Sequence, residues 1–176
     1  DAPLTPLRME ADERLSEAIE TTSSLLTEVM EEVGMGLAPL GEEQAEIVHR
    51  AMAGSLLRTE SALGLMARMA GHPQHARRHL ARALHLATLV DDVGSECKAM
   101  RRLGMLALQS GDEARALDLF TTSANQPTNR DADAVPSMVL AAIASSLTGD
   151  ADAASMWVGK ASKRLMENPS LGSSML

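Results

Sequence analysis

The sequence predicts an all-α protein built from antiparallel helix pairs that stack on one another. Its composition is the first observation behind this prediction. Of 176 residues, 45% are hydrophobic but only 1% are aromatic, and Ala, Leu and Met supply most of the apolar content. These residues favour helices. The second observation is an internal repeat that begins at Leu63 and again at Leu103, a period of about forty residues that is typical of helical repeat arrays.

The two copies of the repeat share one pattern of small and large residues. Each copy reads Leu-Gly-x-x-Ala-x-x-x-Gly-x-x-x-x-Ala-x-x-x-Leu/Phe, first over residues 63–80 and then over residues 103–120. We expect the small residues where the two helices of a pair cross, because short side chains let the backbones approach. A weaker third copy has its turn at Gly149-Asp150, which matches Gly111-Asp112 in the second copy.

The first predicted helix runs from about residue 7 to 33, after a leader that contains two prolines. Apolar residues recur along it at helical spacing, and its other face is rich in glutamate. The stripe consists of Leu15, Ala18, Ile19, Leu25 or Leu26, Val29, Met30 and Val33. Glycines and a proline over residues 34–41 end this helix. The next helix is predicted over residues 42–70 and continues through Gly54, although a break at Gly54-Ser55 is the alternative.

The remaining helices are predicted from turn signals, giving about seven or eight helices in all. Pro73 opens one helix, which runs to Val90, and the following pair turns at Gly111 with Asp112 as its N-cap. Residues 126–134 are predicted to be a polar loop. We therefore divide the chain into an acidic leader with N-terminal capping helices (1–53), helical repeats (54–166) and a C-terminal tail (167–176).

Charge and cysteine content restrict the function classes. The net charge is −8, and residues 1–47 hold twelve acidic side chains against two arginines. This acidity disfavours nucleic-acid binding. The single cysteine, Cys97, is expected on a buried helix face, and its isolation fits a reducing compartment, so we predict a cytoplasmic protein. No run of about 18 apolar residues predicts a membrane span. The opening residues lack an initiator Met and a signal-peptide pattern, so we expect a fragment or a processed product.

The repeat pattern resembles the tetratricopeptide repeat (TPR) over about Leu57 to Arg164. Its usual large aromatics are absent here, and the spacing of 38 to 40 residues exceeds the standard length. The resemblance implies a right-handed superhelix with an atypical N-terminal helical cap. It also implies a non-catalytic scaffold or adaptor that needs no cofactor and binds a protein or peptide in a concave groove. The extended variety of this repeat also occurs in sensor domains of bacterial regulators, so the alternative is a ligand-sensing or dimerisation domain of a transcription regulator.

The resemblance assigns groove positions to the first helix of each pair. In the first two repeats these peptide-binding residues are Arg58, Leu65, Arg68, Met69, Lys98, Arg101, Met105 and Leu108, with Ser61 and Gln109 at the remaining positions. The third repeat supplies Pro136, Val139, Ile143, Ser146 and Leu147. Leucines and methionines with a basic edge predict an acidic or amphipathic peptide partner, because Arg pairs well with carboxylates and Met adapts to varied surfaces. The acidic helix 7–33 could also occupy a basic surface, in cis or from another copy.

Further hypotheses from the sequence concern metal binding, catalysis and self-association. His75 and His79 share a helix face at a spacing that could chelate zinc, but the repeat register puts them on the convex face among arginines, which predicts a basic patch instead. No nucleophile elbow, phosphate loop or dinucleotide fingerprint is present in the sequence. A homodimer formed through the long N-terminal helix is a third hypothesis.

Overall fold

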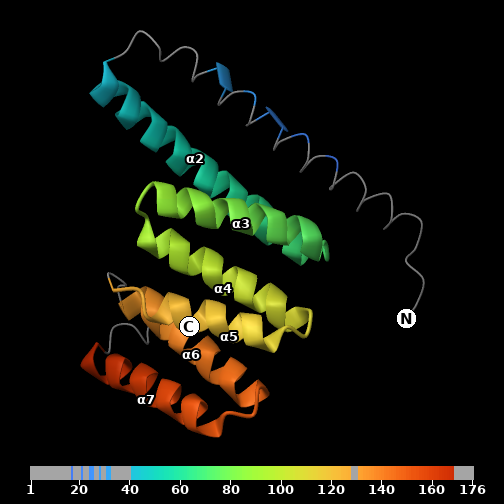
Figure 1. Ribbon diagram of the computed structural model, residues 1–176, viewed down its shortest axis with the longest axis vertical. Coiled ribbons are helices and arrows are strands. Elements are labelled where there is room, and N and C mark those ends of the chain that lie inside the picture. The colour runs from blue at the N-terminus through green and yellow to red at the C-terminus, as the bar shows by residue number, and fades with distance from the viewer. Residues whose placement is uncertain are drawn as a thin grey trace, which may run out of the picture.

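A computed structural model gives the arrangement of residues 41–127 and 131–168, together with seven single positions before them. Within these ranges each helix packs on the next, in a stack that runs from α2 at one end to α7 at the other (Figure 1). Along one side of the stack α4 also contacts both α2 and α6. The helices are α2 (Glu42–Met69), α3 (Pro73–Leu89), α4 (Val93–Gln109), α5 (Glu113–Ala124), α6 (Asp131–Leu147) and α7 (Ala151–Glu167).

One turn geometry connects the helices at four places, both within and between pairs. The middle residue of each three-residue turn has a positive φ, which glycine adopts without strain at Gly71, Gly111 and Gly149. At the fourth turn Asp91 takes this place with φ 55°, a conformation that Asp tolerates better than most residues. The following N–H then donates to a carbonyl five residues back, as from Asp112 to Ala107 at 2.9 Å. This Schellman geometry satisfies the last carbonyls of the helix and reverses the chain.

Small residues allow the helices of a pair to cross closely, as the sequence predicts. Ala67, Ala76 and Ala116 are fully buried. At Gly64 an added Cβ would lie 2.7 Å from Leu80 Cγ, and at Gly104 it would lie 2.4 Å from Phe120 Cε1. Each repeat glycine therefore receives the large residue of the partner helix.

The observed course of α2 and the observed start of α6 test two predictions made from the sequence. Helix α2 runs without interruption through Gly54, so the alternative of a break at Gly54-Ser55 is wrong and residue 53 lies inside a helix. The predicted polar loop over residues 126–134 is wrong from Asp131 onward, because α6 begins there and contains Pro136, whereas Gln126 and Pro127 lie outside any helix. Pro136 is the sixth residue of α6, so it removes a backbone hydrogen bond inside the helix, and the helix nevertheless continues through it. The leader, the C-terminal tail after Asn168 and most of the first predicted helix lie outside the described residues.

The cap at the start of α4 gives a prediction with a defined pH dependence. Asp92 Oδ1 accepts from Ser95 N–H at 3.0 Å, and Oδ2 accepts from the Ser95 hydroxyl at 2.7 Å. The Ser95 hydroxyl bond, followed by the backbone bond, holds the pKa of the Asp92 carboxyl below its ordinary value of 3.8. We expect Asp92→Ala to lower the free energy of unfolding by about 1 kcal/mol at neutral pH.

A lowered folded-state pKa means that this stabilisation is present above the unfolded pKa and is lost as the pH falls through the folded pKa. Urea unfolding of wild type and Asp92→Ala across an acid series should therefore show two stabilities that converge below pH 3.8. Asp118→Ala, at an exposed residue that caps no helix, is the control. A stability gap of constant size throughout the acid range would contradict the assignment.

Candidate functional site

A hollow of about 300 Å³ opens between α2 and α4 on the side that these helices share with α6. It brings together four residues assigned to the groove by the repeat register: Arg58, Ser61, Leu65 and Lys98. The α2 residues come from successive turns of one helix face, and Lys98 reaches the same space from the first turns of α4. Its described lining is Leu57, Arg58, Ser61, Ala62, Leu65, Ser95, Lys98 and Arg102.

The hollow is positively charged. Arg58, Lys98 and Arg102 line it, and none of the described lining residues is acidic. Arg102 Nη1 donates to the Ser61 carbonyl at 3.2 Å, which fixes the guanidinium across the gap between the two helices. Burial, and then the positive charges of Arg68 and Arg101, hold the pKa of Arg102 below its ordinary value. The site therefore concentrates positive charge in a partly desolvated place, where a carboxylate would be favourable.

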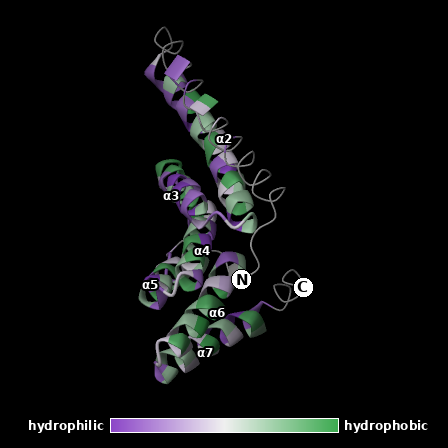
Figure 2. Cartoon of the chain, turned by 90° about the vertical axis from the view of Figure 1, so that its right-hand side faces the viewer, coloured by the Kyte–Doolittle hydropathy of each residue, from purple (hydrophilic) through white to green (hydrophobic). Residues whose placement is uncertain are grey.

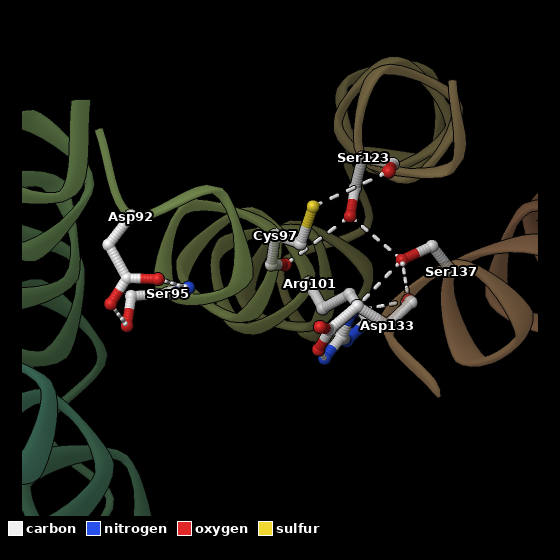
Figure 3. A network of polar contacts seen from close by, with 7 residues as sticks. All are labelled: Asp92, Ser95, Cys97, Arg101, Ser123, Asp133 and Ser137. Carbon is white, nitrogen blue, oxygen red and sulfur yellow. Dashed lines mark hydrogen bonds and ion pairs between the residues drawn. The ribbon is translucent and has the colours of Figure 1, made fainter. Parts of the chain in front are cut away.

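Arg101 is engaged within the fold. Its Nη1 donates to the Asp133 carbonyl at 2.7 Å and to Ser137 Oγ at 3.1 Å, while Nη2 lies 3.7 Å from Asp133 Oδ1. Ser137 Oγ lies 2.7 Å from Ser123 Oγ, which donates to the Cys97 carbonyl (Figure 3). This network joins α4, α5 and α6. We therefore assign Arg101 to the packing of the array and not to the hollow.

Cys97 belongs to the same network. Its side chain is fully buried, and Sγ lies 3.6 Å from the Ser123 carbonyl, to which it donates. Burial raises the pKa of the Cys97 thiol. Cys97 is thus a small buried residue whose thiol is not activated as a nucleophile, as expected from the sequence.

The other predicted groove residues lie apart from the hollow. Met105 and Leu108 are partly buried against the largest core cluster, so part of their surface serves the fold. Met69 is 77% exposed near the end of α2 and does not line the hollow. Arg68 is partly buried and close enough to affect the titration of Arg102.

Helix α6 carries an exposed apolar stripe. Val139, Ile143 and Leu147 recur every fourth residue and are 41%, 47% and 54% exposed. The repeat register predicts these positions as groove positions of the third repeat. Figure 2 shows much of α6 in the hydrophobic colour. The structure thus contains a basic hollow between α2 and α4 and a separate exposed apolar stripe on α6.

The prediction for His79 is wrong. The sequence places it on an exposed convex patch without a nearby carboxylate, but its side chain is 4% exposed and Nδ1 lies 2.6 Å from Glu60 Oε2. The repeat register omits this contact because Glu60 lies nineteen residues earlier, on the facing side of α2. Arg82 Nη1 lies 3.5 Å from the other Glu60 oxygen. The cluster joins α2 to α3, and His79 does not belong to an exposed basic patch.

Among the described lining residues, Arg102 is the one cation that the repeat register misses. The register selects the neighbouring Arg101, but Lys98 and Arg102 are four residues apart and share a helix face. Simple i, i+4 spacing from Lys98 therefore contains the missing signal.

Comparison with solved structures identifies the architecture. The chain is similar to the crystal structure of the TPR domain of Arabidopsis FLU, with a TM-score of 0.57 and 20% sequence identity. The match covers 66% of this chain and 99% of the FLU domain. The chain has a TPR-like fold. In this fold α2, α4 and α6 correspond to the first helices of successive pairs. No protein-family model matches the sequence, and no curated protein matches it.

Two further observations concern the described part of this TPR-like array. None of its helices is long and apolar enough to cross a membrane. Over the same residues, no three His, Cys, Asp or Glu side chains come together as a group that could hold a metal ion.

Proposed function

We propose that this TPR-like chain is a non-catalytic adaptor that binds an acidic, amphipathic segment of a partner protein along α2, α4 and α6. The observation that carries the proposal is the hollow itself, in which Arg58, Lys98 and Arg102 converge without a carboxylate among the described lining residues. Within the described ranges neither Arg58 nor Lys98 forms an ion pair. Both are exposed and available to a partner.

The proposed partner has carboxylates at one end and apolar side chains at the other. Carboxylates would pair with Arg58 and Lys98, which stand on opposite sides of the hollow. The apolar side chains would cover Leu65 and the stripe of Val139 and Ile143 on α6. Charge would orient the segment, while burial of apolar surface would supply much of the affinity.

The residues whose pKa values are shifted give no support to a catalytic function. Asp92 is a helix cap, Cys97 is buried as a thiol, and Arg102 is held by the Ser61 carbonyl. A single buried free cysteine also fits the reducing environment of the cytoplasm.

Reversal of two charges tests the proposal. Peptides selected on the wild-type chain from a random display library should be rich in Asp and Glu, with Leu, Ile or Val at one end. Binding of a selected peptide, measured by fluorescence anisotropy, should weaken at least about tenfold in Arg58→Glu/Lys98→Glu, because like charges then face each other. Arg101 stays unchanged, since its substitution would disturb the packing of α4 on α6.

Arg115→Glu/Lys163→Glu is the matched control, because it makes the same change in net charge at exposed positions on α5 and α7. It should bind the peptide nearly as well as wild type. Selected peptides without acidic enrichment, or equal weakening by both variants, would show that the hollow is not the site.

A further inference from the structure

Helix α2 carries an apolar stripe that lies outside the hollow and of which only Leu63 is buried in the core cluster shared with α3. It extends past α3 at the first end of the stack (Figure 1), and its buried residues begin only at Ala53. Apolar residues nevertheless recur at three- and four-residue spacing along its length. The stripe consists of Ala45, Val48, Met52, Leu56, Leu63 and Met66; Leu63 is buried, Met66 is 49% exposed and the others are partly exposed.

A cavity of about 620 Å³ lies beside this stripe, between α2 and α3. Leu56 belongs to both, so the stripe and the cavity form one surface. Its apolar lining includes Leu56 and Leu86. Arg78, Arg82 and His85, which are cationic or can become so, also line it, together with the buried Glu60 carboxylate that is paired with His79 and Arg82. The cavity is lined by Leu56, Glu60, Arg78, Ala81, Arg82, His85 and Leu86.

Residues 7–33 have the sequence that suits this surface. Their apolar stripe has helical spacing, and residues 10–20 hold five carboxylates against one arginine. A helix of this length spans about 40 Å, which matches the length of α2. The connection over residues 34–41 contains three glycines and a proline, a composition that suits a reversal of the chain.

The described positions within this segment all lie on one side of a helix. They are helical and exposed, and all but Leu25 are polar. Their spacing places them opposite the stripe of Leu15, Ile19, Leu26 and Val33. The described positions are Glu17, Thr21, Ser24, Leu25, Glu28, Glu31 and Glu32.

We propose that residues 7–33 fold back in cis along the stripe of α2, and that their first half covers the cavity beside α3. In this position the segment covers apolar surface at the α2 end of the array, where no further repeat is present to bury it. The carboxylates of residues 10–20 then lie near Arg78, Arg82 and His85. The hollow between α2 and α4 stays open for a partner, so the acidic segment is a cap and not an internal competitor for the groove.

If residues 7–33 pack antiparallel on α2 after a reversal of the chain over residues 34–41, Ile19 lies opposite Leu56. Cross-linking of these two positions tests the proposal. In the full chain, Ile19→Cys/Leu56→Cys is treated with a short bis-maleimide, and Cys97 stays in place because it is fully buried. Circular dichroism confirms that each variant is folded. We expect a cross-linked monomer to form at least about tenfold faster than in the control Ile19→Cys/Leu65→Cys, in which the second cysteine lies in the hollow.

Each other result overturns the proposal. Faster cross-linking in the Leu65→Cys pair would place the segment in the groove. Cross-linked dimers, at about twice the 18.7 kDa of the chain, would show that the segment docks on a second copy. Equal and slow reaction of both pairs would show that residues 7–33 do not dock on α2 at all.

Discussion

Replacing His79 with leucine is expected to lower the free energy of unfolding by about 3–5 kcal/mol, because it leaves the Glu60 carboxylate buried without its closest partner. The Glu60 side chain is 4% exposed, and His79 Nδ1 lies 2.6 Å from Oε2. Arg82 is 3.5 Å from the other oxygen, but its side chain is half exposed and cannot replace a buried contact. Urea unfolding followed by circular dichroism measures the loss.

Two variants separate the buried pair from a general effect of substitution in α3. Gln74→Leu introduces leucine at an exposed position of the same helix and should alter stability by less than about 0.5 kcal/mol. Glu60→Leu/His79→Leu removes both polar groups and should recover most of the loss, since apolar replacement of a buried pair is often close to neutral. A His79→Leu variant as stable as Gln74→Leu would contradict a structural role for the pair.

Replacing Gly104 with alanine is expected to lower the free energy of unfolding by about 1–3 kcal/mol. Alanine is the better helix former, and in an open helix the change would gain up to about 1 kcal/mol. Here the new Cβ would lie 2.4 Å from Phe120 Cε1, and Phe120 is fully buried with no space to withdraw. The steric cost therefore exceeds the gain in helix propensity.

Gly159→Ala is the matched control, because Gly159 lies inside α7 and an added Cβ there meets nothing within 4 Å. This variant should be as stable as wild type or more stable. Gly104→Ala/Phe120→Leu should regain stability relative to Phe120→Leu alone, because the smaller side chain makes room for the methyl group. Stabilisation by Gly104→Ala in the wild-type background would show that the two helices do not cross as closely as described.

The sequence was sufficient to predict most of the fold because the same local signals recur. The Gly-Asp turns and the spacing of Leu63, Gly64 and Ala67 mark both the helix ends and the crossing points. The start of α6 could not be predicted this way. Polar residues and Pro136 give a loop-like composition, and the helix is held there by contacts from outside the segment, such as that of Arg101 with the Asp133 carbonyl.

The candidate site could be predicted only in part, because the repeat register gives a helix face but not the partners of each side chain. Of the residues that it selects, Arg58, Leu65 and Lys98 line one hollow. The repeat register cannot distinguish Arg101, which pairs with Asp133, from Arg102, which lines the hollow, because both are arginines at adjacent positions. His79 is buried against Glu60 through a contact between α3 and α2. The spacing of residues along either helix alone does not reveal this contact.

Photo-cross-linking tests the central claim most directly. A photoreactive amino acid is placed at Ala62, an exposed residue that lines the hollow, or at Ala81, an exposed residue that lines the cavity beside α3. A selected acidic peptide should cross-link to the Ala62 position, with less product when Arg58 and Lys98 are reversed to glutamate. Cross-linking at Ala81 and not at Ala62 would contradict a partner site between α2 and α4.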